Sequence, residues 1–403
     1  MLNEPLIFSR ICDDGQNLWF PEYFYNALFK ICKENGHVEL AGIFPNEAFT
    51  QINLYSSVVM CNEKLFFSPQ RAAEIAVYDL KYNTFQKIQI PTSLEGKTIR
   101  QKRQGGKFCN ITAIGDKVYF LPNKYPGILC YDTLTGAFSC FDDWVDEIER
   151  NRASSWNYFE TFEVVEGRLI LPCVCADAIV VFDSLSQRTH IIHTSATGHP
   201  CKFCGICRER NFLYLLSGDG TVSKRDINLL ADATKVFSLP IQGTEVAEFY
   251  PMQIQNAFIY LFPFGKNKGF KIDTTTGQIL REELLDREKG SKGSDNSFFS
   301  SFCYNQKIYS AAGNGRRLME YDFANGTKRE IKLFSSKADR AFWEEIHQKD
   351  FVRRALGGCC INENAMESLG YMLDNLPTCE NENKAADCRK ISVGSKVYRF
   401  MTQ

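Results

Sequence analysis

The sequence predicts an all-β fold, a seven-bladed β-propeller built from four-stranded antiparallel blades. Seven segments, each opening with an aromatic residue, recur without gaps at intervals of 44 to 53 residues. In each segment a large apolar residue follows 11 positions later. The opening residues are Phe8, Tyr55, Phe108, Phe159, Phe203, Phe249 and Phe298, and their partners are Trp19, Phe66, Tyr119, Ile170, Tyr214, Tyr260 and Tyr309. A ring of six blades, with one unit displaced, is the alternative.

Each unit has the pattern of a four-stranded meander. Polar pairs such as Asn62-Glu63 and Gly115-Asp116 interrupt two apolar runs, which is typical of a β-hairpin. A third run ends in an aspartate in six units, as at Asp79 and Asp132, and a fourth run then returns. An aspartate at that place accepts backbone hydrogen bonds and starts a turn. We therefore interpret the repeated aspartates as fold requirements and not as catalytic carboxylates.

The repeats divide the chain into a propeller, residues 1–335, and a short helical C-terminal extension, residues 336–403. Residues 341–356 and 364–376 have helical spacing, and the terminal segment KVYRFM is a possible latch strand. The first unit carries its own first strand and the seventh its own fourth. The ring is therefore expected to close without an exchanged strand, unless MLNEPLI or KVYRFM supplies one.

Composition limits the class of protein and of partner. The 403 residues carry a formal net charge of −1, with 44% hydrophobic and 24% charged residues, so no global field favours nucleic acid or an acidic membrane. The sequence lacks a secretory signal pattern and an uninterrupted apolar stretch long enough to span a membrane. Sixteen cysteines without such a signal indicate reduced thiols. We expect a cytoplasmic monomer without a cofactor.

The hairpin followed by YDxxTG, as at residues 131–136, resembles kelch-type and related propeller repeats over roughly residues 8–334. The glycine doublet and tryptophan of kelch units are missing, as are the GH and WD pairs of WD40 blades. The whole chain is similar to divergent kelch-like propellers of gut Firmicutes and other anaerobic bacteria. The resemblance implies a soluble, non-catalytic scaffold and supplies no catalytic motif.

Basic residues gather in the loops expected on one face of the ring, where loops on a rigid scaffold commonly carry function. These candidates are Arg71, Arg100, Arg103, Lys124, Lys266, Lys268, Arg316 and Arg317. So arranged, they favour a protein partner, a glycan or an anionic small molecule. Solvated loops without a function are the plainer interpretation. A binding or scaffold protein is the leading hypothesis, and a lyase or glycan-processing enzyme with its site at the central channel is the alternative.

Two further features have a functional and a structural interpretation. Trp144 and Trp156 lie in a long acidic inter-blade loop, where they would contact a partner or stack on a sugar, although packing on the ring is favoured. His199, Cys201 and Cys204 have the spacing of half a zinc site. Strand alternation would direct Cys204 and Cys207 to opposite faces, so we expect structural thiols and no metal.

The two functional hypotheses differ in what they predict for the channel. An enzyme should place several titratable side chains with perturbed pKa values in one deep cavity. A scaffold should present a broad basic or aromatic surface around a plugged or featureless channel.

Overall fold

The computed structural model describes most of the propeller. The described residues are 10–23, 26–47, 53–94, 97–98, 106–155, 157–194, 202–240, 249–263, 268–285, 300–304, 306–312, 317–331 and 334–335. All but Ser335 belong to one compact unit, residues 1–47 with 51–334. The predicted helical extension and terminal latch strand lie outside the described residues, and the domain boundary near residue 335 stays a prediction.

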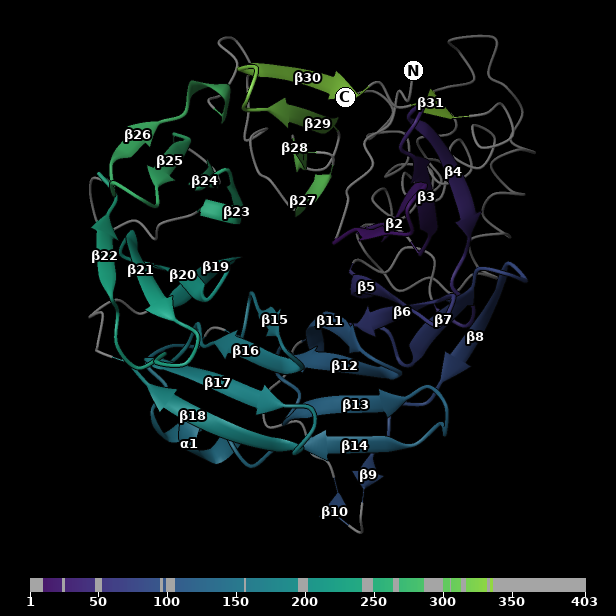
Figure 1. Cartoon of the computed structure of the whole chain (residues 1–403). Coiled ribbons are helices and arrows are strands. Elements are labelled where there is room, and N and C mark those ends of the chain that lie inside the picture. The colour runs from purple at the N-terminus through teal and green to yellow at the C-terminus, as the bar shows by residue number, and fades with distance from the viewer. Residues whose placement is uncertain are drawn as a thin grey trace, which may run out of the picture. The chain divides into compact units, whose positions relative to one another are not determined.

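Seven antiparallel sheets follow one another around a ring, and each is built from consecutive strands (Figure 1). Blades one and two comprise β1 (Cys12–Asp13), β2 (Asn17–Pro21), β3 (Leu28–Cys32) and β4 (His37–Gly42), then β5 (Tyr55–Cys61), β6 (Lys64–Pro69), β7 (Ile75–Asp79) and β8 (Thr84–Ile88). Blades three and four comprise β11 (Phe108–Ile114), β12 (Lys117–Pro122), β13 (Ile128–Asp132) and β14 (Phe138–Phe141), then β15 (Glu163–Val165), β16 (Arg168–Pro172), β17 (Ala178–Asp183) and β18 (Arg188–His193).

The remaining blades repeat the pattern. Blade five comprises β19 (Phe203–Glu209), β20 (Phe212–Ser217), β21 (Thr221–Asp226) and β22 (Lys235–Ser238), and blade six β23 (Phe249–Gln255), β24 (Phe258–Pro263), β25 (Phe270–Asp273) and β26 (Ile279–Arg281). Blade seven comprises β27 (Ser300–Tyr304), β28 (Lys307–Ala312), β29 (Arg317–Asp322) and β30 (Thr327–Ile331). The seven-bladed prediction is confirmed and the six-bladed alternative is wrong.

Short elements decorate the ring. A hairpin of β9 (Ser93–Leu94) and β10 (Lys97–Thr98) joins blades two and three, α1 (Val145–Arg150) follows blade three, and the 3₁₀ helix η1 (Glu283–Leu285) follows blade six. The strand β31 (Phe334–Ser335) lies next to β4 in the sheet of blade one. Blades one and seven each contain four strands of their own, as the repeats predicted. Among the described helices none is long and apolar enough to span a membrane.

The repeated turns form as the residue types require. Asn62 and Glu63 adopt φ of 50° and 57°, the left-handed region used by tight hairpin turns. At the turn between the third and fourth strands of blade three, the Asp132 carboxylate accepts hydrogen bonds from the backbone N–H groups of Leu134 and Thr135, both at 3.0 Å. These hydrogen bonds hold the pKa of Asp132 below its usual range. The aspartate starts the turn, as expected, and is occupied there.

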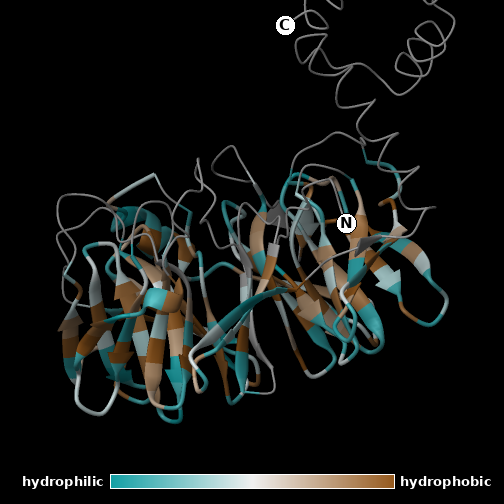
Figure 2. Ribbon diagram, turned by 90° about the horizontal axis from the view of Figure 1, so that it is seen from above, coloured by the Kyte–Doolittle hydropathy of each residue, from teal (hydrophilic) through white to brown (hydrophobic). Residues whose placement is uncertain are grey.

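The core lies between neighbouring blades and is largely aromatic. The residue 11 positions after each opening aromatic faces the next blade: Trp19 lies 5.7 Å from Tyr78, and Tyr119 lies 5.5 Å from Phe182. Apolar residues follow the strands, whereas hydrophilic residues concentrate in the turns (Figure 2). Burying both faces of each sheet against its neighbours provides the main driving force for the ring.

Candidate functional site

A cavity of about 380 Å³ lies on the axis of the ring, within the described residues. Every blade contributes at least one lining residue from its first strand or from the segment that leads into it. The lining residues are Arg10, Ile11, Ser57, Val58, Ile111, Thr161, Phe162, Glu163, Gly205, Ile206, Cys207, Arg208, Met252, Gln253, Ile254 and Ser301. The lining is predominantly polar, with charged and hydroxyl side chains interspersed among apolar ones, and convergent polar groups are what fix the orientation of a bound small molecule.

Arg10 reaches across the axis. Its guanidinium donates a hydrogen bond to the backbone carbonyl of Glu160, which leads into the first strand of blade four. Blades two and three separate blades one and four along the ring, so this contact spans the channel. The amide of Asn110 donates to the same carbonyl at 3.2 Å. Arg10 therefore brings a positive charge into the cavity, on a side chain fixed at its far end.

Glu160 itself does not line the cavity. Its carboxylate accepts a hydrogen bond from Asn157 Nδ2 at 2.6 Å. Burial raises the pKa of Glu160, although Asn157 and the charge of Arg10 oppose the shift. This carboxyl therefore supports the channel wall.

Glu163 and Arg208 lie together in the cavity, on the first strands of blades four and five. Burial raises the pKa of Glu163 to about 7, opposed by the charge of Arg208 and by the backbone N–H of Val164. Arg208 donates from Nε to the carbonyl of Arg210 at 2.9 Å and from Nη1 to that of Val164 at 3.5 Å. Its other N–H groups find no acceptor within the described part of the chain and are available to a ligand.

The raised pKa of Glu163 predicts a pH-dependent cost to folding. Because the folded state favours the protonated carboxyl, wild type loses stability as the pH rises from about 4.5 to about 7. A glutamine removes that cost. The free energy of unfolding of Glu163→Gln should therefore exceed that of wild type by about 1–2 kcal/mol at pH 8, and the two should be about equal at pH 4. Urea denaturation at both pH values measures the difference. If the stability difference between Glu163→Gln and wild type is the same at pH 4 and pH 8, the carboxyl is not desolvated.

The basic loop residues are only partly within the described residues. Arg71 and Lys268 are exposed, and Lys124 is half-buried. Arg317 lies in β29, with its side chain not described, and the remaining loop candidates Arg100, Arg103, Lys266 and Arg316 lie outside the described residues. A basic rim therefore stays a prediction.

Trp144 is not available to a partner or a sugar. It precedes α1 with 1% of its surface exposed, and its Nε1 donates to the carbonyl of Phe141 at 3.0 Å. Its ring lies 5.1 Å from that of Tyr158 and 5.2 Å from that of Phe159. Trp144 packs against the ring, as the favoured interpretation predicted, and the prediction that it contacts a partner or a sugar is wrong. Trp156 lies outside the described residues.

The cysteine cluster is arranged differently from the expectation. A register shift between Phe203 and Gly205 interrupts strand alternation at Cys204. Cys204 and Cys207 consequently pack against the same hydrophobic cluster between blades five and six, and the expected opposite orientation is wrong. His199 and Cys201 lie outside the described residues. Within the described part of the chain no group of three or more metal-ligating side chains occurs.

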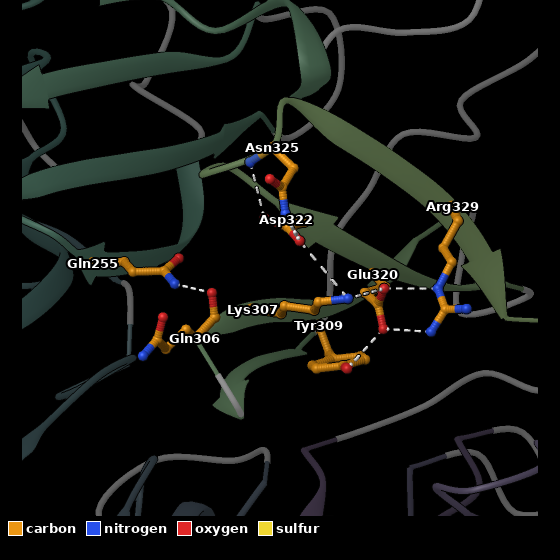
Figure 3. Close-up of polar contacts among 8 residues, drawn as sticks. All are labelled: Gln255, Gln306, Lys307, Tyr309, Glu320, Asp322, Asn325 and Arg329. Atoms are coloured by element: carbon orange, nitrogen blue, oxygen red, sulfur yellow. Dashed lines mark hydrogen bonds and ion pairs between the residues drawn. The ribbon is translucent and has the colours of Figure 1, made fainter.

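Glu320 is the centre of a second polar cluster, on blade seven (Figure 3). The carboxylate accepts from Arg329 Nε and Nη2 at 2.6 and 2.8 Å, from Lys307 Nζ at 2.9 Å and from the Tyr309 hydroxyl at 2.7 Å. These donors, Arg329 foremost, lower the pKa of Glu320 to about 2. Tyr309 also lines a void of about 40 Å³ with Leu18 of blade one. Because the carboxylate has four donors and only 3% exposure, we assign the cluster a structural role at the closing edge of the ring.

The residues of the axial cavity were not singled out from the sequence, although the repeat contains a signal for them. Arg10, Glu163 and Arg208 stand two, four and five positions after the opening aromatic of their units. At the first two of these positions no other unit carries a charged residue, and at the third only Asp13 does. A departure from the repeat consensus on the innermost strand marks a residue that the fold does not require.

Comparison with known proteins supports the fold alone. No protein-family model and no curated protein sequence matches the chain. Streptogramin B lyase is 11% identical, with 79% of this chain and 94% of that chain covered and a TM-score of 0.56. Sqt1 of Saccharomyces cerevisiae is 10% identical, with 81% and 85% covered and a TM-score of 0.55. A chain of the mitotic checkpoint complex is 8% identical, with 78% and 86% covered and a TM-score of 0.53.

These matches include a lyase and a member of a multiprotein complex, so the shared propeller does not choose between catalysis and binding. The resemblance to kelch-like bacterial repeats stays a prediction.

Proposed function

We propose that this propeller is a binding protein that holds a small anionic molecule in the cavity on its axis. The observation that carries the proposal is the placement of two guanidinium groups, Arg10 and Arg208, among the residues lining one cavity of about 380 Å³. That volume lies within the range of small-ligand sites, about 300–1,000 Å³. The proposed site lies on the axis and not on the loop face that the sequence predicted, but the ligand class, an anionic small molecule, is the predicted one.

The polar groups around the two arginines suit a ligand with several oxygens. Ser57, Thr161, Gln253 and Ser301 line the same cavity, and each carries a hydrogen-bond donor. Gln253 Nε2 donates to Ser301 Oγ at 2.7 Å, so part of this group is already ordered between blades six and seven. A preordered polar lining lowers the entropy cost of binding. A carboxylate, sulfate or phosphate group is the matching chemistry.

Arg208 provides the sharpest test. In Arg208→Gln we expect the affinity for sulfate and for oxalate to fall about 10–100-fold, since a hydrogen bond to a charged group contributes about 1.5–3 kcal/mol. Isothermal titration calorimetry at pH 7 measures the loss. Arg188→Gln is the matched control. This substitution removes the same charge, and Arg188 is exposed on β18 at the outer edge of blade four. Equal affinity of wild type and Arg208→Gln would contradict the proposal.

Catalysis in the same cavity is the second candidate. It is favoured by one observation, the Glu163 carboxyl with a pKa near 7 beside Arg208, which is the range expected of a general acid or base. Arg208 would then stabilise developing negative charge on the substrate. Turnover of a bound carboxylic acid that disappears in Glu163→Gln while binding persists would establish this alternative.

A further inference from the structure

The axial cavity contains a titratable carboxyl among its cationic groups. Glu163 lines the same cavity as Arg10 and Arg208, so an anion held by either guanidinium comes close to this carboxyl. Two negative charges in one partly desolvated cavity repel each other strongly, because the effective dielectric constant there is well below that of water. A bound anion and an ionised Glu163 are therefore poorly compatible.

The surroundings of Glu163 leave protonation as the way to relieve this repulsion. Arg208 and Cys207 on β19 are the titratable groups of the neighbouring blade that line the cavity, and Arg10 faces them from across the axis. Across its own sheet Glu163 pairs with Ile170, which is apolar. Among the described residues Glu163 has no ion pair within 4 Å that would hold it ionised, although Arg208 attracts it. Burial already raises the pKa of this carboxyl in the unliganded protein, so protonation costs less than it would for a carboxyl in water.

We infer that the cavity binds its anion together with one proton, which Glu163 takes up from solvent and then donates as a hydrogen bond to the ligand. The carboxylate and a solvent proton become a neutral carboxyl group, and no other bond changes. The inference rests on the proposed function and adds that the site recognises an anion with an acceptor for the Glu163 hydroxyl. Affinity should therefore fall as the pH rises, even for an anion whose own charge is constant.

Calorimetry counts the proton directly. Sulfate and oxalate stay fully ionised between pH 6 and 8, so any proton exchanged belongs to the protein. Titrations in two buffers of low and high ionisation enthalpy give the uptake at each pH. With a free pKa near 7 the expected uptake is about 0.1 proton at pH 6, about 0.5 at pH 7 and about 0.9 at pH 8. With that pKa the affinity of wild type should fall about fivefold between pH 7 and pH 8.

Two variants assign the proton. Glu163→Gln keeps the shape of the protonated carboxyl and its donor, so it should bind with no proton uptake and with the same affinity at pH 7 and 8. Glu160→Gln removes a second carboxyl of raised pKa near the channel, and its proton uptake should match that of wild type. Circular dichroism spectra like that of wild type establish that each variant has folded.

The outcomes separate the two proposals. Anion binding without proton uptake in wild type, or uptake that survives in Glu163→Gln, overturns this inference and leaves the anion site in place. Absence of sulfate and oxalate binding to wild type overturns the proposed function, and this inference with it. Uptake that vanishes in Glu163→Gln and persists in Glu160→Gln supports both.

Discussion

Trp144→Ala should destabilise the propeller by about 3–5 kcal/mol, the largest single effect expected in this molecule. The indole is 1% exposed and fills a cluster shared by blades three and four, with Tyr158 and Phe159 against its ring. Truncation removes this apolar contact and leaves a cavity that the two sheets cannot close. It also removes the donor to the Phe141 carbonyl. Urea denaturation followed by near-ultraviolet circular dichroism measures the loss.

A control for the Trp144 variant is an exposed leucine in blade three. Leu134→Ala shortens a side chain with 73% exposure in the β13–β14 turn, and its stability should stay within about 0.5 kcal/mol of wild type. A loss of less than about 1 kcal/mol in Trp144→Ala would show that the tryptophan does not hold the two blades together. In that event the acidic loop would again be a candidate binding segment.

Glu320→Gln should cost about 2–4 kcal/mol at neutral pH, the second largest effect. The amide keeps the shape of the side chain but turns an NH₂ group toward donors, so Arg329 and Lys307 lose acceptors in the cluster. Arg329 is 69% exposed and regains water, which keeps the cost below that of a fully buried ion pair. Glu330→Gln, at an exposed site on the neighbouring strand β30, is the control and should be nearly neutral.

The pH dependence of the Glu320 variant has a definite sign. The folded state lowers the pKa of this carboxyl to about 2, so its contribution is complete above about pH 5 and is lost between about pH 4.5 and pH 2. The stability difference between wild type and Glu320→Gln should shrink toward zero over that window. A difference that stays constant as the pH falls would mean that charge plays no part in the cluster.

Much of the fold could be predicted because the repeat encodes it locally. The spacing between Phe108 and Tyr119 reflects one hairpin, whose turn at Gly115 needs a residue tolerant of positive φ. Asp132 and Gly136 define the turn between β13 and β14 in the same way. These relationships connect residues fewer than about a dozen positions apart, so they recur along the chain and can be recognised by aligning the chain with itself.

The candidate site was predicted less well because it depends on contacts between distant segments. Arg10 meets the carbonyl of Glu160 across 150 residues of sequence, and only ring closure brings them together. The charge pattern of the sequence indicated the loop residues, because several basic residues lie there. Each charged cavity residue, by contrast, is a single departure from the repeat within an otherwise regular strand or the segment leading into it. Glu320 is similar: it is the only acidic residue two positions before a turn aspartate, and the sequence alone did not reveal its three donor residues.

The sequence by itself determined the number of blades, their antiparallel strands and the structural role of the repeated aspartates, because hairpin and turn geometry follow from short-range backbone preferences. Only the tertiary structure decided which side chains share the axis of the ring and which tryptophan is buried. Radial stacking turns one edge of every sheet toward a common centre, so the burial of Glu163 beside Arg208, and hence its affinity for a proton, comes from two blades acting together.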